Sequence, residues 1–99
     1  MGSNFYMTKG DKQVHLGKRS KGWAFLFKAN AGVTNLRTWY SHAHDLELKG
    51  YKLTNDNGAT ETNLKDLLKG ILAIAREKQH GNHTWQDEHG NSFYEREFS

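Results

Sequence analysis

Apolar and polar positions alternate along residues 14–29, and this alternation predicts a β-hairpin around which the rest of the chain is organised. On the second limb, one face of the expected strand carries four apolar residues: Trp23, Phe25, Phe27 and Ala29. The intervening residues form the opposite face of the strand, which ends in the charged Lys28. This strand is therefore expected to be buried mainly on one side. Val14 and Leu16 share a face of the first limb. Residues 18–22 form the predicted cationic turn between the limbs.

Two later segments have the spacing of amphipathic helices. Apolar residues of the first recur at helical intervals: Leu36, Trp39, Tyr40, Ala43 and Leu46. Thr34 or Asn35 can cap its start, and Gly50 can end it. The second has the clearest helical pattern in the chain: Leu64, Leu67, Leu68, Ile71, Leu72, Ile74 and Ala75. We expect Thr60 or Thr62 to cap it and Gly81 to end it.

The remaining segments predict short strands. Residues 1–8 can open the sheet, residues 51–54 can form a strand between the helices, and residues 83–99 read as a second, smaller hairpin that completes the sheet or lies across it. This order is typical of an α+β fold. We expect a single domain over residues 1–99, with a small antiparallel sheet built on the central β-hairpin, two α-helices packed on one face and a C-terminal hairpin.

Composition excludes several classes of protein. The 99 residues contain no cysteine, which rules out disulfides and thiolate zinc sites. No apolar run approaches the roughly 18 residues that span a bilayer, so we expect a soluble, cytoplasmic protein that has no membrane partner. The formal net charge of +3 is a mild excess that favours contact with anions. No cofactor is expected.

The cationic turn is the candidate binding site. Lys18, Arg19 and Lys21, with Lys28 on the next strand, could grip phosphates while Trp23 stacks on a base, and His15 could contribute. Exposed turns also carry charge simply for solubility, and the sequence leaves that alternative open.

Histidine chemistry is the other alternative. His80, His83 and His89, with Asp87 or Glu88, could offer ligands to zinc or nickel, but their spacing matches no established site. His15 and Ser20 could supply a base and a nucleophile, yet no third residue is evident to orient the imidazole. We therefore expect neither a metal site nor catalytic residues.

The hairpin and the tail carry motifs shared with a known group of proteins. These are His15-Leu16-Gly17-Lys18, Ser20, Gly22-Trp23 with Phe25 and Phe27, and Asp87-x-x-Gly90-x-x-Phe93 with Phe98-Ser99. In these motifs, at its MGSNFY start and around Gly50-Tyr51 and Asn57-Gly58, the chain resembles small phage-encoded proteins of uncharacterised function. Many members carry a cysteine pair ahead of the hairpin, where residues 8–13 of this chain have none.

The resemblance implies a phage origin and a role inside an infected bacterium. With the small size and the lack of reaction chemistry, it leads us to expect a non-catalytic accessory protein that binds a host protein or nucleoprotein, as a host-takeover or anti-defence inhibitor would. A small basic nucleic-acid-binding module and a histidine-based metal-binding protein or hydrolase are the alternatives. The sequence leaves the oligomeric state open.

Overall fold

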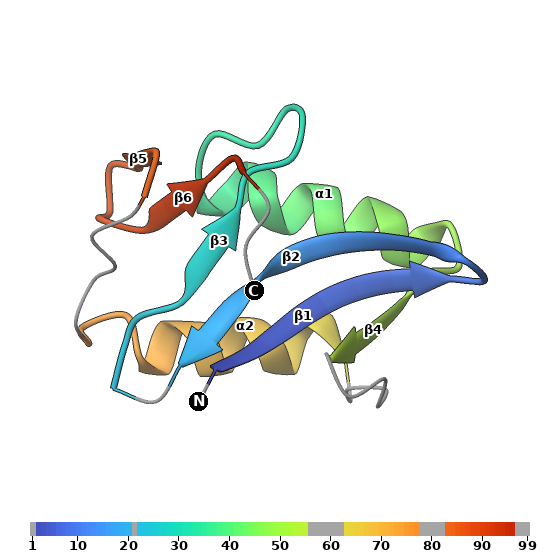
Figure 1. Ribbon diagram of the computed structural model, residues 1–99, viewed down its shortest axis with the longest axis horizontal. Helices are drawn as coiled ribbons and strands as arrows, with labels where there is room; N and C mark the ends of the chain where they lie inside the picture. Colours follow the sequence, from blue (N-terminus) through green and yellow to red (C-terminus); the bar gives the residue numbers. More distant parts are fainter. Residues whose placement is uncertain (1, 21, 56–62, 78–82, 97–99) are drawn as a thin grey trace.

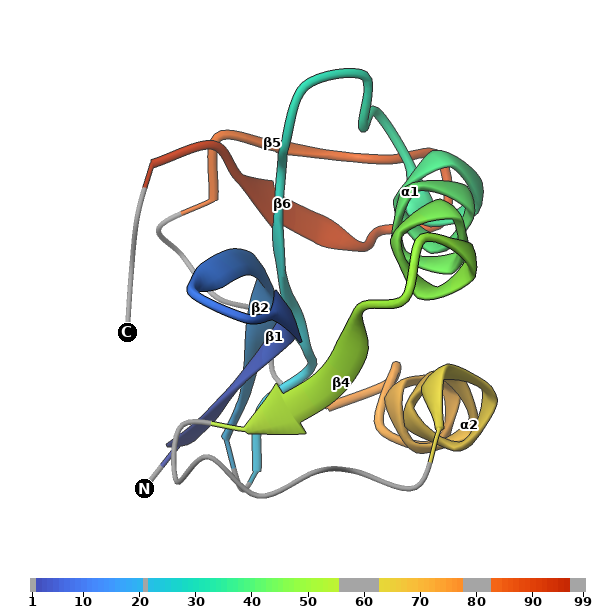
Figure 2. The ribbon, with the colours of Figure 1, turned by 90° about the vertical axis from the view of Figure 1, so that its right-hand side faces the viewer.

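The computed structural model describes residues 2–20, 22–55, 63–77 and 83–96. Its elements are, in chain order, β1 (Gly2–Lys9), β2 (Lys12–Ser20), β3 (Leu26–Lys28), α1 (Leu36–Leu48), β4 (Lys52–Asn55), α2 (Leu64–Ala73), β5 (Trp85–Gln86) and β6 (Ser92–Tyr94). The described strands form one sheet in the order β4-β1-β2-β3-β6-β5. The two helices lie side by side on the same face of this sheet (Figures 1 and 2), which confirms the predicted α+β fold.

The sheet is mostly antiparallel, with one parallel pair. β1 and β2 form a long antiparallel hairpin, β4 pairs with the outer edge of β1, and β5 and β6 form the predicted C-terminal hairpin. β6 runs parallel to β3, with Phe27 opposite Phe93, so the tail completes the sheet. Within the described residues, no helix is long and apolar enough to span a bilayer.

The central hairpin exists, but its limits differ from those predicted. β2 continues to Ser20, so Lys18 and Arg19 are strand residues and not part of a turn. β3 is short and pairs with β2 only at Gly17 and Lys18. The prediction of a strand buried on one side is also wrong, because every residue from 24 to 29 is buried.

A β-bulge in β2 explains part of this difference. Phe5 pairs with Gly17 and Tyr6 pairs with His15, which leaves Leu16 as an extra residue. Leu16 is fully buried in the core, and its carbonyl oxygen accepts a hydrogen bond from the indole N–H of Trp39 at 2.9 Å. The bulge therefore shifts the alternation of inward and outward side chains along the second half of β2.

The core lies between the sheet and the helices. Trp39 of α1 is fully buried, and its ring centroid lies 5.0 Å from that of Phe27 and 5.8 Å from that of Phe25, both in edge-on geometry. Phe27 stacks on Phe93 of the neighbouring parallel strand at 4.9 Å. These aromatic contacts join the N-terminal strands, α1 and the C-terminal hairpin in one core.

The helix caps only partly follow the sequence prediction. Asn35 caps α1 as expected, in a capping box in which its side chain accepts from the backbone N–H of Thr38 at 2.9 Å. α2 is capped instead by Asn63, whose side chain accepts from the N–H of Asp66 at 2.8 Å, while Thr60 and Thr62 lie outside the described residues. α2 also ends at Ala73, well before residue 81. The residues from 75 to 77 are exposed, so they offer no apolar face that would continue the helix.

Candidate functional site

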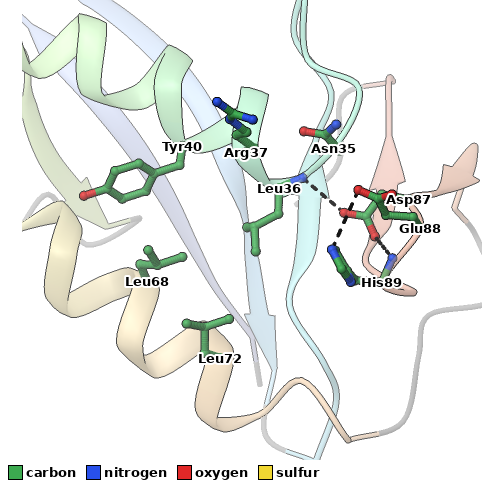
Figure 3. A pocket seen from close by; sticks show the side chains of 9 residues that line it. All are labelled: Asn35, Leu36, Arg37, Tyr40, Leu68, Leu72, Asp87, Glu88 and His89. Carbon is green, nitrogen blue, oxygen red and sulfur yellow. Dashed lines mark hydrogen bonds and ion pairs between the residues drawn. The ribbon is translucent and has the colours of Figure 1, made fainter.

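A groove opens where the two helices meet the turn between β5 and β6 (Figure 3). Its volume is about 390 Å³, within the range of about 300–1,000 Å³ that is usual for binding pockets. We call it the helix groove, and its lining is Asn35, Leu36, Arg37, Tyr40, Leu68, Leu72, Asp87, Glu88 and His89. Three segments that are distant in the sequence therefore build one concave surface.

The floor of the helix groove is apolar. Leu36 and Tyr40 are four residues apart on α1, and Leu68 and Leu72 are four apart on α2, so each pair lies on one helix face. Leu72 is 54% exposed, which is unusual for a large aliphatic side chain in this protein. The groove thus exposes apolar surface that neither helix covers.

Asp87 fixes the turn that forms one wall of the groove. Its Oδ2 atom accepts from the backbone N–H of Leu36 at 3.1 Å and from the Asn91 side chain at 3.0 Å. Its Oδ1 atom accepts from the backbone N–H groups of His89 and Asn91, both at 2.9 Å. Burial disfavours the charged carboxylate, but the hydrogen bonds from Asn91, Leu36 and His89 outweigh it and hold the pKa of Asp87 below its usual value.

The rim of the helix groove carries charge of both signs. Arg37 is exposed on α1, and Glu88 is 77% exposed on the turn. The Nε2 atom of His89 lies 3.7 Å from the Glu88 carboxylate. Both oxygens of Asp87 are occupied by backbone and amide donors, so this carboxylate is poorly placed to accept a proton from a substrate. The arrangement suits binding and orientation better than proton transfer.

The residues predicted to bind at the cationic turn are not gathered in one place. Lys18 and Arg19 are successive strand residues and therefore point to opposite faces of the sheet. The guanidinium of Arg19 lies on the helix side, 5.4 Å from the ring centroid of Phe5. Trp23 is half-buried, and its backbone N–H donates to the carbonyl oxygen of Ser20, the last residue of β2, at 3.1 Å. Lys21 lies outside the described residues.

His15 and Lys28 are buried, each only 6% exposed. The Nε2 atom of His15 donates to Oδ1 of Asn4 at 3.0 Å, and its ring stacks on Tyr6 at 4.9 Å. Lys28 donates to the backbone carbonyl oxygen of Glu95 at 3.1 Å. The predicted binding set is thus divided between buried strand positions and two opposite faces of the sheet, because the alternation of a strand separates residues that are adjacent in sequence.

Within the described residues, no group of three histidine, aspartate or glutamate side chains is placed to hold a metal ion. His80 lies outside the described residues. His89 and Glu88 stand at the groove rim, while Asp87 is engaged with the backbone.

The sequence pattern does not predict the helix groove. Leu68 and Leu72 were predicted only as part of the apolar pattern of the second helix. One signal was present: the apolar positions of this short helix cover more of its circumference than a single buried stripe needs. No comparison assigns the site, because no family model, curated protein or solved structure shows a significant match to this chain.

Proposed function

We propose that this chain is a non-catalytic binding protein that docks an apolar segment of a protein partner in the helix groove. The observation that carries the proposal is the exposed Leu72 on the floor of a 390 Å³ groove, beside Leu36, Tyr40 and Leu68. Burial of such a patch by a partner side chain would remove apolar surface from water, which is the main source of free energy in most protein association.

The rim indicates the chemistry of the partner. Arg37 on α1 and Glu88 on the β5–β6 turn would each favour an opposite charge on the docked segment. A segment with one large apolar anchor between an acidic and a basic residue fits both the floor and the rim. The hydrogen bonds of Asp87 hold the turn in place before binding, which reduces the entropy lost on association.

The phage resemblance supplies the biological setting of the proposal. A phage accessory protein acts on host components, so the partner would be a bacterial protein or nucleoprotein. A host segment bound in the helix groove would no longer be available to its own target. Binding would therefore inhibit the host protein.

Capture from bacterial lysate treated with nuclease tests this proposal, with the intact protein as bait and mass spectrometry as the readout. Leu72→Glu places a charge on the groove floor, and Ala73→Glu places the same charge at the next, exposed position of α2, which does not line the groove. We expect Leu72→Glu to abolish the capture of one host protein that Ala73→Glu retains. The proposal fails if no captured protein distinguishes the two variants.

A further inference from the structure

The sheet has a second face, which points away from both helices (Figure 2). Because Phe5 and Met7 of β1 point into the core, strand alternation places Asn4, Tyr6 and Thr8 on this second face. We call it the outer face, and it consists of these three residues and the side chains that lie beside them on the neighbouring strands.

Strand pairing brings lysines from three strands to the outer face. Lys18 of β2 pairs with Asn4, and Lys52 of β4 pairs with Thr8, and paired residues share a face. Lys28 of β3 lies on the same face, two residues after the partner of Lys18. The strand residues that the structure describes on this face include no aspartate or glutamate, so their charge is positive.

A hydrogen-bonded polar layer surrounds an aromatic ring between these lysines. Tyr6 pairs with His15, and their ring centroids lie 4.9 Å apart in a stacked arrangement. Asn4 holds His15 through a hydrogen bond of 3.0 Å, and the hydroxyl oxygens of Thr8 and Thr54 are hydrogen-bonded at 2.9 Å. Tyr6 is half-buried, so part of its side chain lies at the surface in a fixed position.

The outer face is polar where it is exposed. The large hydrophobic side chains that are exposed in the described part of the chain are Leu48 and Leu72, and both belong to the helices. An apolar protein segment or a membrane would therefore find little to bury on the outer face. Cations and an aromatic ring on a polar sheet are typical of surfaces that bind single-stranded nucleic acid, where phosphates contact the cations and a base stacks on the ring.

We propose that the outer face binds single-stranded nucleic acid, with phosphates at Lys18 and Lys52 and a base against Tyr6. The β1 partners of the two lysines are Asn4 and Thr8, which are about 13 Å apart along the strand at about 3.3 Å per residue. The lysines flank β1 from opposite sides, and Tyr6 lies midway between them. A nucleic-acid strand that crosses β1 obliquely therefore meets a cation, the ring and the second cation in turn. The helix groove takes no part, because it lies on the other side of the sheet.

Fluorescence anisotropy tests the role of the lysines, with the intact protein and labelled single-stranded DNA or RNA of equal length. Lys18→Gln/Lys52→Gln should weaken binding about tenfold or more at about 50 mM salt. It should also reduce the slope of log affinity against log salt concentration by about 1.4, at about 0.7 per lost phosphate contact. Lys65→Gln/Lys69→Gln removes the same charge from exposed positions of α2 and should leave the affinity and the slope nearly unchanged.

Tyr6 provides a test that is independent of charge. Tyr6→Leu should weaken binding about fivefold or more because it removes the stacking surface, whereas Tyr6→Phe keeps the ring and should bind nearly as the wild type does. Native circular dichroism spectra are the control for folding. The lysine variants change polar positions only, so they test the outer face even if Tyr6→Leu does not fold.

Tight binding of either DNA or RNA with these variant effects supports the proposal, and the tighter of the two identifies the nucleic acid. The proposal is overturned if neither strand binds at about 50 mM salt, or if both double lysine variants weaken binding equally. It is also overturned if a folded Tyr6→Leu variant binds as the wild type does. Tighter binding of polyglutamate than of either strand would assign the outer face to an acidic protein instead.

Discussion

The carboxylate of Asp87 accepts a hydrogen bond at 3.1 Å from the backbone N–H of Leu36, the first residue of α1, 51 positions earlier in the chain. This contact joins the C-terminal hairpin to the start of a helix whose first N–H groups have no partner within the helix. A negative charge at this point is also favoured by the helix dipole. Asp87 therefore stabilises the wall of the helix groove and α1 together.

Replacement of Asp87 should measure this stabilisation. We expect Asp87→Asn to lower the free energy of unfolding by about 1–3 kcal/mol, because the amide cannot reproduce the charge-assisted bonds at both oxygens. Glu88→Gln, at the neighbouring exposed carboxylate, should change it by less than about 0.5 kcal/mol. Urea unfolding at neutral pH gives both values. Equal losses in the two variants would contradict this role of Asp87.

Acid should remove the contribution of Asp87. Its folded pKa lies below the ordinary value of 3.8, so the stabilisation is present above that value and is lost as the pH falls through the folded pKa. The stability difference between the wild type and Asp87→Asn should therefore shrink below about pH 4. A difference that stays constant down to the acid transition would exclude a role for the charge.

Two tryptophans allow a matched test of buried and exposed hydrogen bonds. Trp39 donates to the carbonyl oxygen of Leu16 inside the core, and Trp85 donates to that of Thr34 at 3.1 Å at the surface. Trp39→Phe should lower the free energy of unfolding by about 2–4 kcal/mol, since it leaves a buried carbonyl unsatisfied and opens a cavity. Trp85→Phe should cost clearly less in the same thermal or urea unfolding experiment.

Two glycines should respond in opposite ways to alanine. At Gly17 a Cβ atom would clash with the Phe25 ring and lie 2.5 Å from the backbone oxygen of Leu26, so Gly17→Ala should destabilise the fold by about 1–3 kcal/mol. At Gly70 the nearest atom is the flexible guanidinium of Arg19 at 3.0 Å. Gly70→Ala should therefore be neutral or stabilising by up to about 1 kcal/mol, through helix propensity. A large loss at Gly70 would show that Arg19 cannot move.

His42 should make stability depend on pH near neutrality. Burial lowers its pKa below 6.5, with Asp45 opposing this effect and Lys49 adding to it. Its Nε2 atom is buried and forms no hydrogen bond with a described residue. Protonation therefore favours the unfolded chain, and stability should fall as the pH drops below about 6.5. His42→Gln should reduce the loss between about pH 7.5 and pH 5.5, and His44→Gln, at an exposed position, should not.

Local pattern was sufficient to predict much of this fold. The asparagine cap of α1 and the C-terminal hairpin each follow from residues that are near in sequence. The β-bulge at Leu16 could not be predicted, because an inserted residue leaves no mark on the alternation of residue types. Because the bulge reverses the alternation after Leu16, the sequence alone does not show which face of the sheet Lys18 or Arg19 occupies.

The helix groove depends on long-range contacts that a single sequence does not reveal. The groove needs α1, α2 and the β5–β6 turn to meet. The parallel pairing of β3 with β6 was likewise not predicted, because it joins segments more than 60 residues apart. Lys18 and Arg19 are adjacent in sequence but lie on opposite faces of the sheet, so the predicted cationic cluster does not form.

Photo-crosslinking from the floor of the helix groove shows whether this surface contacts a protein partner. A benzophenone amino acid replaces Leu72 in one variant and Ala73 in another, and each is irradiated in nuclease-treated bacterial lysate. We expect position 72 to form one dominant protein adduct that position 73 does not form, and excess unlabelled wild type should compete it away. Equal adducts from both positions, or none from position 72 while both variants remain folded, would show that the helix groove does not dock a protein partner.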